Sequence, residues 1–211
     1  MTGLRERKKR ATRDALMTAA LRLALERGLE NVRVEDIAAA AGVSPRTYNN
    51  YFASKYEAIT ARHTDRVRAS VAALRARPPD EPLWDALTEA MVRPWAEHAG
   101  TTGTPPSPEL LAAIRMLNDE PALRAESVRV AFAVSGELAA AVGERTGIDP
   151  GRDLYPSLVA VTAAAAVQAG VDHWLRSDPP VPLVPLLRDC LRALASGLPE
   201  PTREGDDSWT S

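Results

Sequence analysis

A short polar run over residues 44–51 combines the side-chain types that proteins use to contact DNA. Arginine can donate a bidentate pair of hydrogen bonds to guanine, and asparagine can form a matching pair with adenine. Hydroxyl groups donate to backbone phosphates, and flanking cations add phosphate contacts of their own. The residues predicted to contact double-stranded DNA are therefore Arg33, Ser44, Pro45, Arg46, Thr47, Asn49, Asn50, Tyr51 and Lys55.

Histidine and cysteine are too sparse to suggest an enzyme. The histidines His63, His98 and His173 are widely spaced, and the sequence contains no H-x-x-x-H, G-x-S-x-G or glycine-rich phosphate loop. Asp172 precedes His173 in an apolar stretch, where a polar core or pocket site is a simpler interpretation than a catalytic dyad. The single Cys190 excludes a disulfide framework and a cysteine-based metal site. We predict no catalytic residue, no metal and no cofactor.

Two short helices joined by a tight turn are predicted to position the polar run. The first, over 34–41, has two carboxylates in its first turn, where they oppose the positive end of the helix dipole. Gly42 follows and can adopt positive φ, Ser44 offers an N-cap oxygen, and Pro45 suits the first position of a helix. This is the spacing of a helix-turn-helix, whose second helix enters the major groove. An ordinary helical hairpin is the alternative.

The helix-turn-helix is expected to pack on a longer amphipathic helix over 9–27. Tyr48 and Phe52 are spaced to pack inward, and the second short helix is expected to end near residue 51 or 52. The basic arm over 1–10 is expected to be disordered at its start. It either contacts phosphates and the minor groove or is a solvated tail.

A fourth helix over 55–76 is expected to leave this head, with Lys55 at its start and an apolar face. Its surface would carry Arg62, Arg66 and Arg68, and a proline-rich junction over 78–82 would end it. Five more helical segments are predicted, over 83–98, 109–118, 122–146, 154–176 and 184–196. Alanine and leucine are abundant and β-branched runs are scarce, so the fold class is all-α with about nine helices.

Charge is divided unevenly along the chain. Residues 1–77 contain 16 Lys and Arg against 8 Asp and Glu, whereas residues 78–211 contain 10 against 20. This asymmetry indicates a polyanion-binding module attached to a different kind of domain. No apolar run reaches the roughly 18 residues needed to span a membrane, and the N-terminus lacks the apolar core of a signal peptide. We therefore expect a cytoplasmic protein with no membrane partner.

The run V-x-D-I-A-x-x-A-G-V-S-x-x-T, followed by an aromatic pair and F-x-S-K, resembles the TetR family of bacterial transcriptional regulators. The resemblance covers about residues 5–59. It implies that Thr47 faces the groove, that Tyr51 contacts phosphate where the family often has histidine, and that Lys55 grips the DNA backbone. The sequence departs from the family at Arg33, where threonine is usual, and at Asn49, where tyrosine is usual.

The resemblance also implies a homodimer in which the segments over 154–176 and 184–196 form a four-helix bundle. The small residues Ala160, Ala163, Ala164 and Gly170 would allow close helix approach, and the alternative is that they belong to the core of the subunit. A ligand cavity is implied in the C-terminal domain. The residues predicted to line it, which could instead be core, are Trp84, Met91, Trp95, His98, Met116, Phe132, Tyr155, His173 and Trp174.

The predicted function is a ligand-responsive regulator, most simply a repressor that is released from DNA by a small apolar or amphipathic effector such as an acyl or aromatic compound. The predicted domains are the arm and helix-turn-helix over 1–54, the connecting helix over 55–77, a ligand-binding and dimerisation domain over 78–197, and a disordered tail over 198–211. The alternative is a helical adaptor or architectural DNA-binding protein without ligand gating.

Overall fold

The structure is a computed structural model that describes residues 2–98, 107–178 and 181–199, together with all side chains in those ranges except Thr2, His98 and residues 131–133. Within these ranges all regular structure is helical, which confirms the all-α prediction with nine α-helices and one 3₁₀ turn. The elements are α1 (Thr2–Arg27), η1 (Leu29–Asn31), α2 (Val34–Ala40), α3 (Pro45–Asn49), α4 (Lys55–Arg75), α5 (Leu83–His98), α6 (Pro108–Asp119), α7 (Pro121–Thr146), α8 (Tyr155–Arg176) and α9 (Leu183–Ala195). The predicted disorder beyond residue 199 falls outside the described residues.

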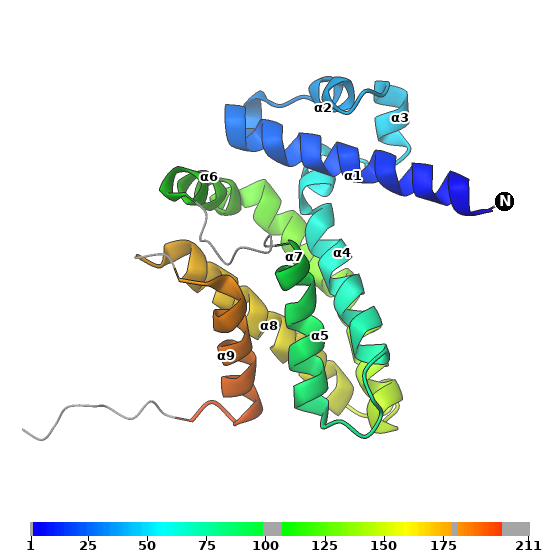
Figure 1. Ribbon diagram of the computed structural model, residues 1–211, viewed down its shortest axis with the longest axis vertical. Coiled ribbons are helices and arrows are strands. Elements are labelled where there is room, and N and C mark those ends of the chain that lie inside the picture. The colour runs from blue at the N-terminus through cyan, green and yellow to red at the C-terminus, as the bar shows by residue number, and fades with distance from the viewer. Residues whose placement is uncertain (1, 99–106, 179–180, 200–211) are drawn as a thin grey trace, which may run out of the picture.

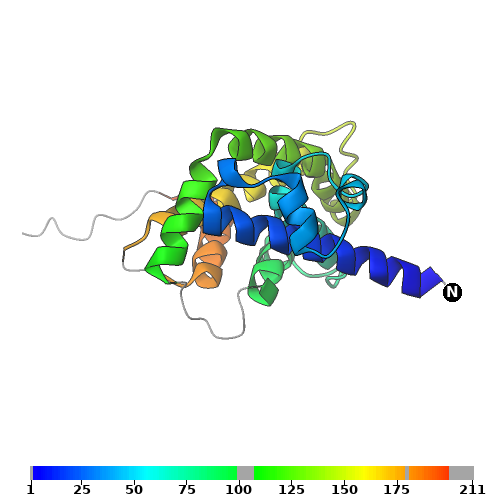
Figure 2. The same ribbon diagram turned by 90° about the horizontal axis from the view of Figure 1, so that it is seen from above.

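The helices form a head and a body. Helices α1, α2 and α3 lie together at one end, and α4 runs from them down the length of the body beside α5 and α7 (Figure 1). Helices α8 and α9 pack on each other and complete the body. Seen from above, the head lies over the body and the N-terminal part of α1 projects beyond it (Figure 2).

The basic arm is helical, which corrects the expectation that it would be disordered at its start. Helix α1 begins at Thr2 and not near residue 9. Arginine, lysine and glutamate are good helix formers, so the arm continues the helix. The Nε of Arg7 donates to the carbonyl oxygen of Gly3 at 3.1 Å, and the Thr12 hydroxyl donates to that of Lys8 at 3.0 Å. The cations of the arm are therefore carried on an exposed helical extension.

The body has its own hydrophobic core, made by α4, α5, α7, α8 and α9. The small residues Ala160, Ala163 and Gly170 are buried in the subunit, so the core alternative holds for them. A Cβ added at Gly170 would lie 2.8 Å from Leu187 Cδ2, which shows how closely α8 and α9 approach. These residues are consequently not on the surface that α8 leaves open.

The core of the head is shared with the body. It contains residues from α1 to α4, and in addition Leu123, which is only 5% exposed and comes from the first turn of α7. Leu117, near the end of α6, packs against the same cluster. The corner between α6 and α7 therefore inserts apolar side chains into the head, and we call Leu117 and Leu123 the corner leucines.

Helix α8 is long and apolar enough to cross a membrane when judged by length and composition alone, with a mean hydropathy of 1.3 in its most apolar window. This differs from the expectation that no stretch would reach such a length. One face of the helix, including Val159 and Val167, is buried against the rest of the body. The core helix of a soluble protein satisfies the same criterion, so the finding is weak evidence for a membrane span.

Candidate DNA-binding site

The turn between α2 and α3 is built around a glycine with positive φ. Gly42 has φ 69°, and its N–H donates to the carbonyl oxygen of Ala39 at 3.0 Å. The N–H of Val43 donates to that of Ala38 at 2.9 Å, which completes a Schellman motif. A side chain at residue 42 would meet open space, but the backbone conformation would be strained. The turn that the sequence predicted is therefore present with the expected chemistry.

Helix α3 is capped as predicted but is shorter than expected. The Ser44 Oγ accepts from the backbone N–H of Thr47 at 3.1 Å, and the two hydroxyl oxygens lie 2.9 Å apart. The helix ends at Asn49, because the next residues close tighter turns in which the N–H of Tyr51 donates to the carbonyl oxygen of Tyr48 at 2.8 Å. The predicted end near residue 51 or 52 is thus wrong by two residues or more.

The inner face of α3 is fixed by two aromatic side chains, as predicted. Tyr48 and Phe52 are almost completely buried, and their ring centroids are 5.8 Å apart. The Tyr48 hydroxyl donates to the carbonyl oxygen of Ser54 at 2.9 Å. Burial, reinforced by the charge of Glu57, raises the pKa of Tyr48 to about 12, so the phenol stays protonated and can donate. This anchor sets the rotation of α3 about its own axis.

The opposite face of α3 is open to solvent. Pro45, Arg46, Asn49 and Asn50 are exposed. Within the described residues, the side chains of Arg46, Asn49 and Asn50 form no hydrogen bond or ion pair, so their donors are free. These are the side chains with base-reading geometry. Their contacts with DNA remain a prediction, supported by their exposure on one short helix.

Arg33 lies at the start of α2, where its backbone N–H donates to the Asp36 carboxylate at 3.1 Å. A guanidinium has no acceptor atom. The Arg33 side chain therefore cannot accept the hydrogen bond from the backbone N–H of Asp36 that would complete a capping box. The Arg33 residue is exposed and remains a candidate for a phosphate contact. Asp36 thus caps the backbone N–H of Arg33, whereas the cap that a threonine hydroxyl at residue 33 would provide is absent.

Lys55 has an internal role that the sequence did not reveal. Its Nζ donates to the carbonyl oxygens of Leu29 at 2.7 Å and Val32 at 3.0 Å, and so ties the start of α4 to the η1 turn. Both of those residues are buried. An ammonium has three donor hydrogens, so one is still available for a phosphate.

We expect Lys55→Met to lower the free energy of unfolding by about 1–3 kcal/mol, because two carbonyl groups lose a charged donor. If the third hydrogen binds phosphate, the slope of log affinity against log salt should also become shallower by about one unit per protomer. Chemical denaturation and a fluorescence titration of DNA at several salt concentrations would measure the two effects. In the denaturation measurement, Lys8→Met in the exposed arm is the control for the loss of one positive charge. An unchanged salt slope would restrict Lys55 to positioning the head.

The predicted ligand-lining residues are distributed over the body and do not converge. Met91 is buried in the body core, and Trp84 and Trp95 pack against it. The indole N–H of Trp174 donates to the carbonyl oxygen of Val181 at 3.0 Å. Met116 is 76% exposed, and Tyr155 and His173 are exposed as well. The side chains of His98 and Phe132 lie outside the described residues.

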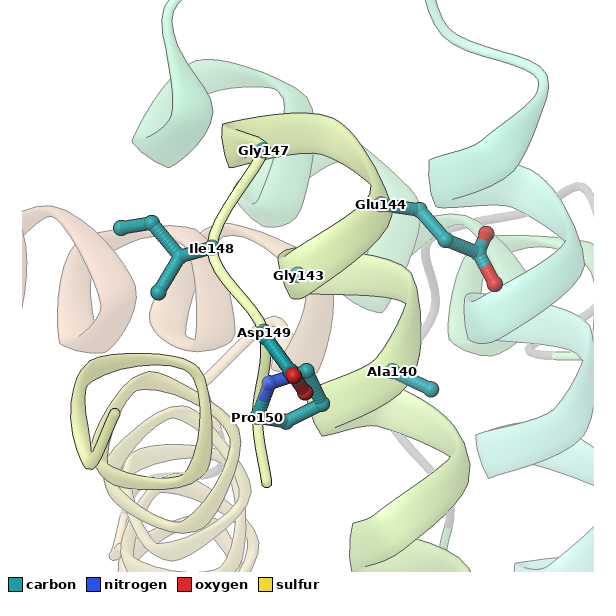
Figure 3. Close-up of a pocket in the computed structure, with 7 residues that line it drawn as sticks. All are labelled: Ala140, Gly143, Glu144, Gly147, Ile148, Asp149 and Pro150. Atoms are coloured by element: carbon teal, nitrogen blue, oxygen red, sulfur yellow. The ribbon is translucent and has the colours of Figure 1, made fainter. Parts of the chain in front are cut away.

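Two hollows in the described part of the chain are lined by other residues. The first, of about 400 Å³, is an open depression at the end of α7 (Figure 3). Glu144 and Ile148 are among the residues that line it, and their side chains extend in opposite directions. The Glu144 carboxylate pairs with Arg75 at 2.7 Å. The second, of about 200 Å³, lies where head meets body and includes Arg13, Tyr51 and Arg129 in its lining. Among the described residues of the two linings, none is a predicted ligand-lining residue.

Sequence reasoning missed a group of cations on α4. Arg62 and Arg66 were placed on the surface of the helix, but the Nε atoms of both are buried. Residues 62, 63 and 66 lie three, four and seven positions after Ile59, which is itself in the head core. That spacing puts them on the same helical face as Ile59, and it is the signal that could have identified them.

An outward-facing polar helix, held by a capped turn on an all-helical chain, defines a helix-turn-helix DNA-binding regulator of transcription. Comparison with known proteins identifies the family. Residues 16–60 match the family model for bacterial regulatory proteins, tetR family, and residues 81–199 match the model for the MftR C-terminal domain. The chain is 36% identical over 183 residues to the HTH-type transcriptional regulator TcmR of Streptomyces glaucescens, covering 83% of this chain and 79% of TcmR. The chain belongs to the TetR family and is a transcriptional regulator, not an enzyme.

Solved structures share the fold at low sequence identity. A TetR-family transcriptional regulator of Syntrophomonas wolfei superposes with a TM-score of 0.62 and 16% identity, covering 91% of this chain and 98% of that one. Thermus thermophilus FadR, a TetR-family repressor in complex with lauroyl-CoA, gives a TM-score of 0.50 and 21% identity, covering 92% of this chain and 98% of that one. At these identities the likeness shows the fold alone.

Proposed function

We propose that this regulator is a ligand-responsive repressor that binds a pseudo-palindromic operator as a homodimer and leaves it when a small effector binds. The observation that carries the proposal is an outward-facing α3 in the head combined with an exposed apolar face on α8 in the body. In a twofold dimer built on that face, each protomer would present one α3 to DNA. The two helices would lie about one helical turn apart, roughly 34–36 Å.

The exposed face of α8 supports the dimer. Leu154 is 67% exposed, Leu158 51% and Val161 54%, and Tyr155 lies on the same end of the helix. These residues recur at a spacing of three to four, so they form one stripe on the side of α8 opposite its buried residues. We propose that α8 and α9 of two protomers pair along this stripe in a four-helix bundle. A dimer seam accounts for the apolar surface of α8 without a membrane, as expected of a cytoplasmic repressor.

The effector is proposed to bind in the region over 78–197, with residues 55–77 as connector and residues 1–54 as the DNA-binding head. An acyl or aromatic compound with apolar and polar parts suits the tryptophans of the body. Thermus thermophilus FadR, which shares the fold, is in complex with the acyl compound lauroyl-CoA. By analogy with that repressor, we propose an effector of amphipathic character.

Several contacts could transmit effector binding to the head. The corner leucines join the head core to α6 and α7. Arg13 of α1 forms an ion pair with Asp65 of α4, and the Arg62 guanidinium donates to the Thr18 hydroxyl at 2.8 Å. A shift of α4 or of the corner would therefore move α1 and rotate the head. A coupling free energy of about 1–3 kcal/mol would change operator affinity roughly five- to 150-fold.

We expect Leu123→Ala to lower the stability of the head by about 2–5 kcal/mol, because a buried leucine is removed from its core. The head and the body should then unfold in separate transitions, with the head first, in differential scanning calorimetry. Val128→Ala, which truncates a 56% exposed side chain on the same helix, should leave the unfolding profile unchanged. A single transition at nearly the wild-type temperature in Leu123→Ala would contradict coupling through the corner.

Selection of bound DNA from a random pool tests the proposed function directly. The expected product is an inverted repeat with half-sites about one helical turn apart. A subsequent screen for small molecules that release the selected DNA would identify the effector. Binding without sequence preference, or an operator that no compound releases, would favour the alternative of an architectural or adaptor protein without ligand gating.

A further inference from the structure

Two arginines of α4 lack the carboxylate partners that their neighbours on the same helix have. Arg68 pairs with Glu137 at 3.4 Å and Arg75 pairs with Glu144 at 2.7 Å, both on the exposed side of the helix. Among the described residues, no carboxylate forms an ion pair with Arg62 or Arg66, and the Nε of each is buried without a hydrogen-bond partner. Both residues are half-buried. A charge that is partly withdrawn from water is normally paired, so two neighbouring cations without a counter-ion require an explanation.

The local charge balance around these residues is positive. Burial, with a further effect from the charge of Arg62, lowers the pKa of Arg66 to about 10, so the guanidinium is still protonated at neutral pH. Burial and the charge of Arg66 also lower the pKa of His63, which leaves the imidazole neutral. The group therefore has two cations and a neutral imidazole.

Trp95 of α5 holds the Arg66 guanidinium in a defined plane. The guanidinium carbon lies 3.9 Å from the centroid of the Trp95 ring, a close stacked cation–π contact. Stacking occupies a face of the guanidinium and not its N–H edge, and no described residue accepts a hydrogen bond from Arg66. A planar, pre-oriented fork with free donors is the geometry that binds a carboxylate or phosphate through two parallel hydrogen bonds.

We propose that the effector carries an anionic group, of carboxylate or phosphate type, which binds at Arg66 and Arg62, and that its apolar part packs beside Trp95. This inference rests on the proposed function and specifies the chemistry of the effector. The Arg62 guanidinium already donates to Thr18 of α1, so an anion at this position would compete for a group that links body to head. Arg62 would thus take part both in the anion site and in the contact with α1.

A matched pair of fluorescent probes tests the proposal. The anion 1-anilinonaphthalene-8-sulfonate and the uncharged N-phenyl-1-naphthylamine share one aromatic skeleton and differ by the sulfonate. We expect Arg66→Gln to weaken sulfonate binding about tenfold or more, because a charge-assisted pair is lost, while binding of the uncharged probe changes less than twofold. Arg68→Gln, on the exposed side of the same helix, should change neither affinity. Arg66→Met provides a second variant if Arg66→Gln folds poorly.

Equal losses for the two probes, an unchanged sulfonate affinity in both Arg66 variants, or an equal loss in Arg68→Gln would overturn the anion site. A gel shift with selected operator DNA, without probe, tests the proposed function separately from the anion site. Retained operator binding in Arg66→Gln together with unchanged sulfonate affinity would remove the anion site and leave the repressor proposal standing. Absence of sequence-specific DNA binding in the wild-type protein would remove the repressor proposal itself.

Discussion

Leu158→Glu is expected to separate the two protomers and to reduce operator affinity at least about a hundredfold. Leu158 is half exposed in the single subunit, in the middle of the apolar stripe on α8. Burying a leucine contributes about 1.5–3 kcal/mol, and the twofold axis makes each substitution act twice. The change also places two carboxylates in an apolar interface, where their desolvation adds to the loss. A single head would retain only half of the contacts with a palindromic operator.

Light scattering coupled to size exclusion measures the oligomeric state of this variant, and fluorescence anisotropy measures its affinity for operator DNA. Val128→Glu is the matched control, because Val128 is 56% exposed but lies on α7, away from the stripe. Circular dichroism should show the same helix content for both variants. A Leu158→Glu protein that remains a dimer with wild-type operator affinity would exclude the α8 stripe as the seam.

Arg46→Ala is expected to abolish discrimination at one base pair in each half-site while leaving affinity for unrelated DNA nearly unchanged. Arg46 is exposed on α3, and the anchor formed by Tyr48 holds that helix in one orientation. A bidentate contact with guanine contributes about 1–3 kcal/mol of discrimination, so a twofold operator should lose about 2–6 kcal/mol. The nonspecific part of binding depends on phosphate contacts, most of which other residues provide.

The measurement is a competition between selected operator and scrambled DNA, repeated with operators mutated at each position. Arg176→Ala, an exposed arginine at the end of α8, is the control for a lost charge in the body. If Arg46→Ala lowers affinity for all sequences equally, the residue contacts phosphate and not a base. In that case Asn49 and Asn50 become the principal candidates for base recognition.

The parts of the site that follow from local chemistry were predictable from sequence. The turn and the cap of α3 follow from the backbone preferences of Gly42 and Pro45 and from the hydroxyl of Ser44. The spacing of Tyr48 indicates that its side chain points inward. The length of α3 was overestimated, because the chain tightens into i→i+3 turns after Asn49, and no residue there marks the change.

Contacts between distant segments could not be predicted in the same way. Lys55 binds carbonyl groups of the η1 turn, more than twenty residues earlier in the chain, and Arg66 stacks on Trp95 of another helix. The aromatic and methionine spacing of the body fits a core as well as a cavity, because both place apolar side chains on one helical face. The structure assigns Met91 to the core and leaves Met116 at the surface.

The corner leucines set a limit on how regulators of this kind can be recombined. A chimaeric repressor that joins this head to the body of a relative, with the crossover anywhere in α4, would lose Leu117 and Leu123 from the head core. The chimaera would then have a cavity in the head core unless the new body supplied apolar side chains of similar volume at the same corner. Exchange of α6 and the first turn of α7 together with the head would preserve that contact, so the unit that can be transplanted is discontinuous in sequence.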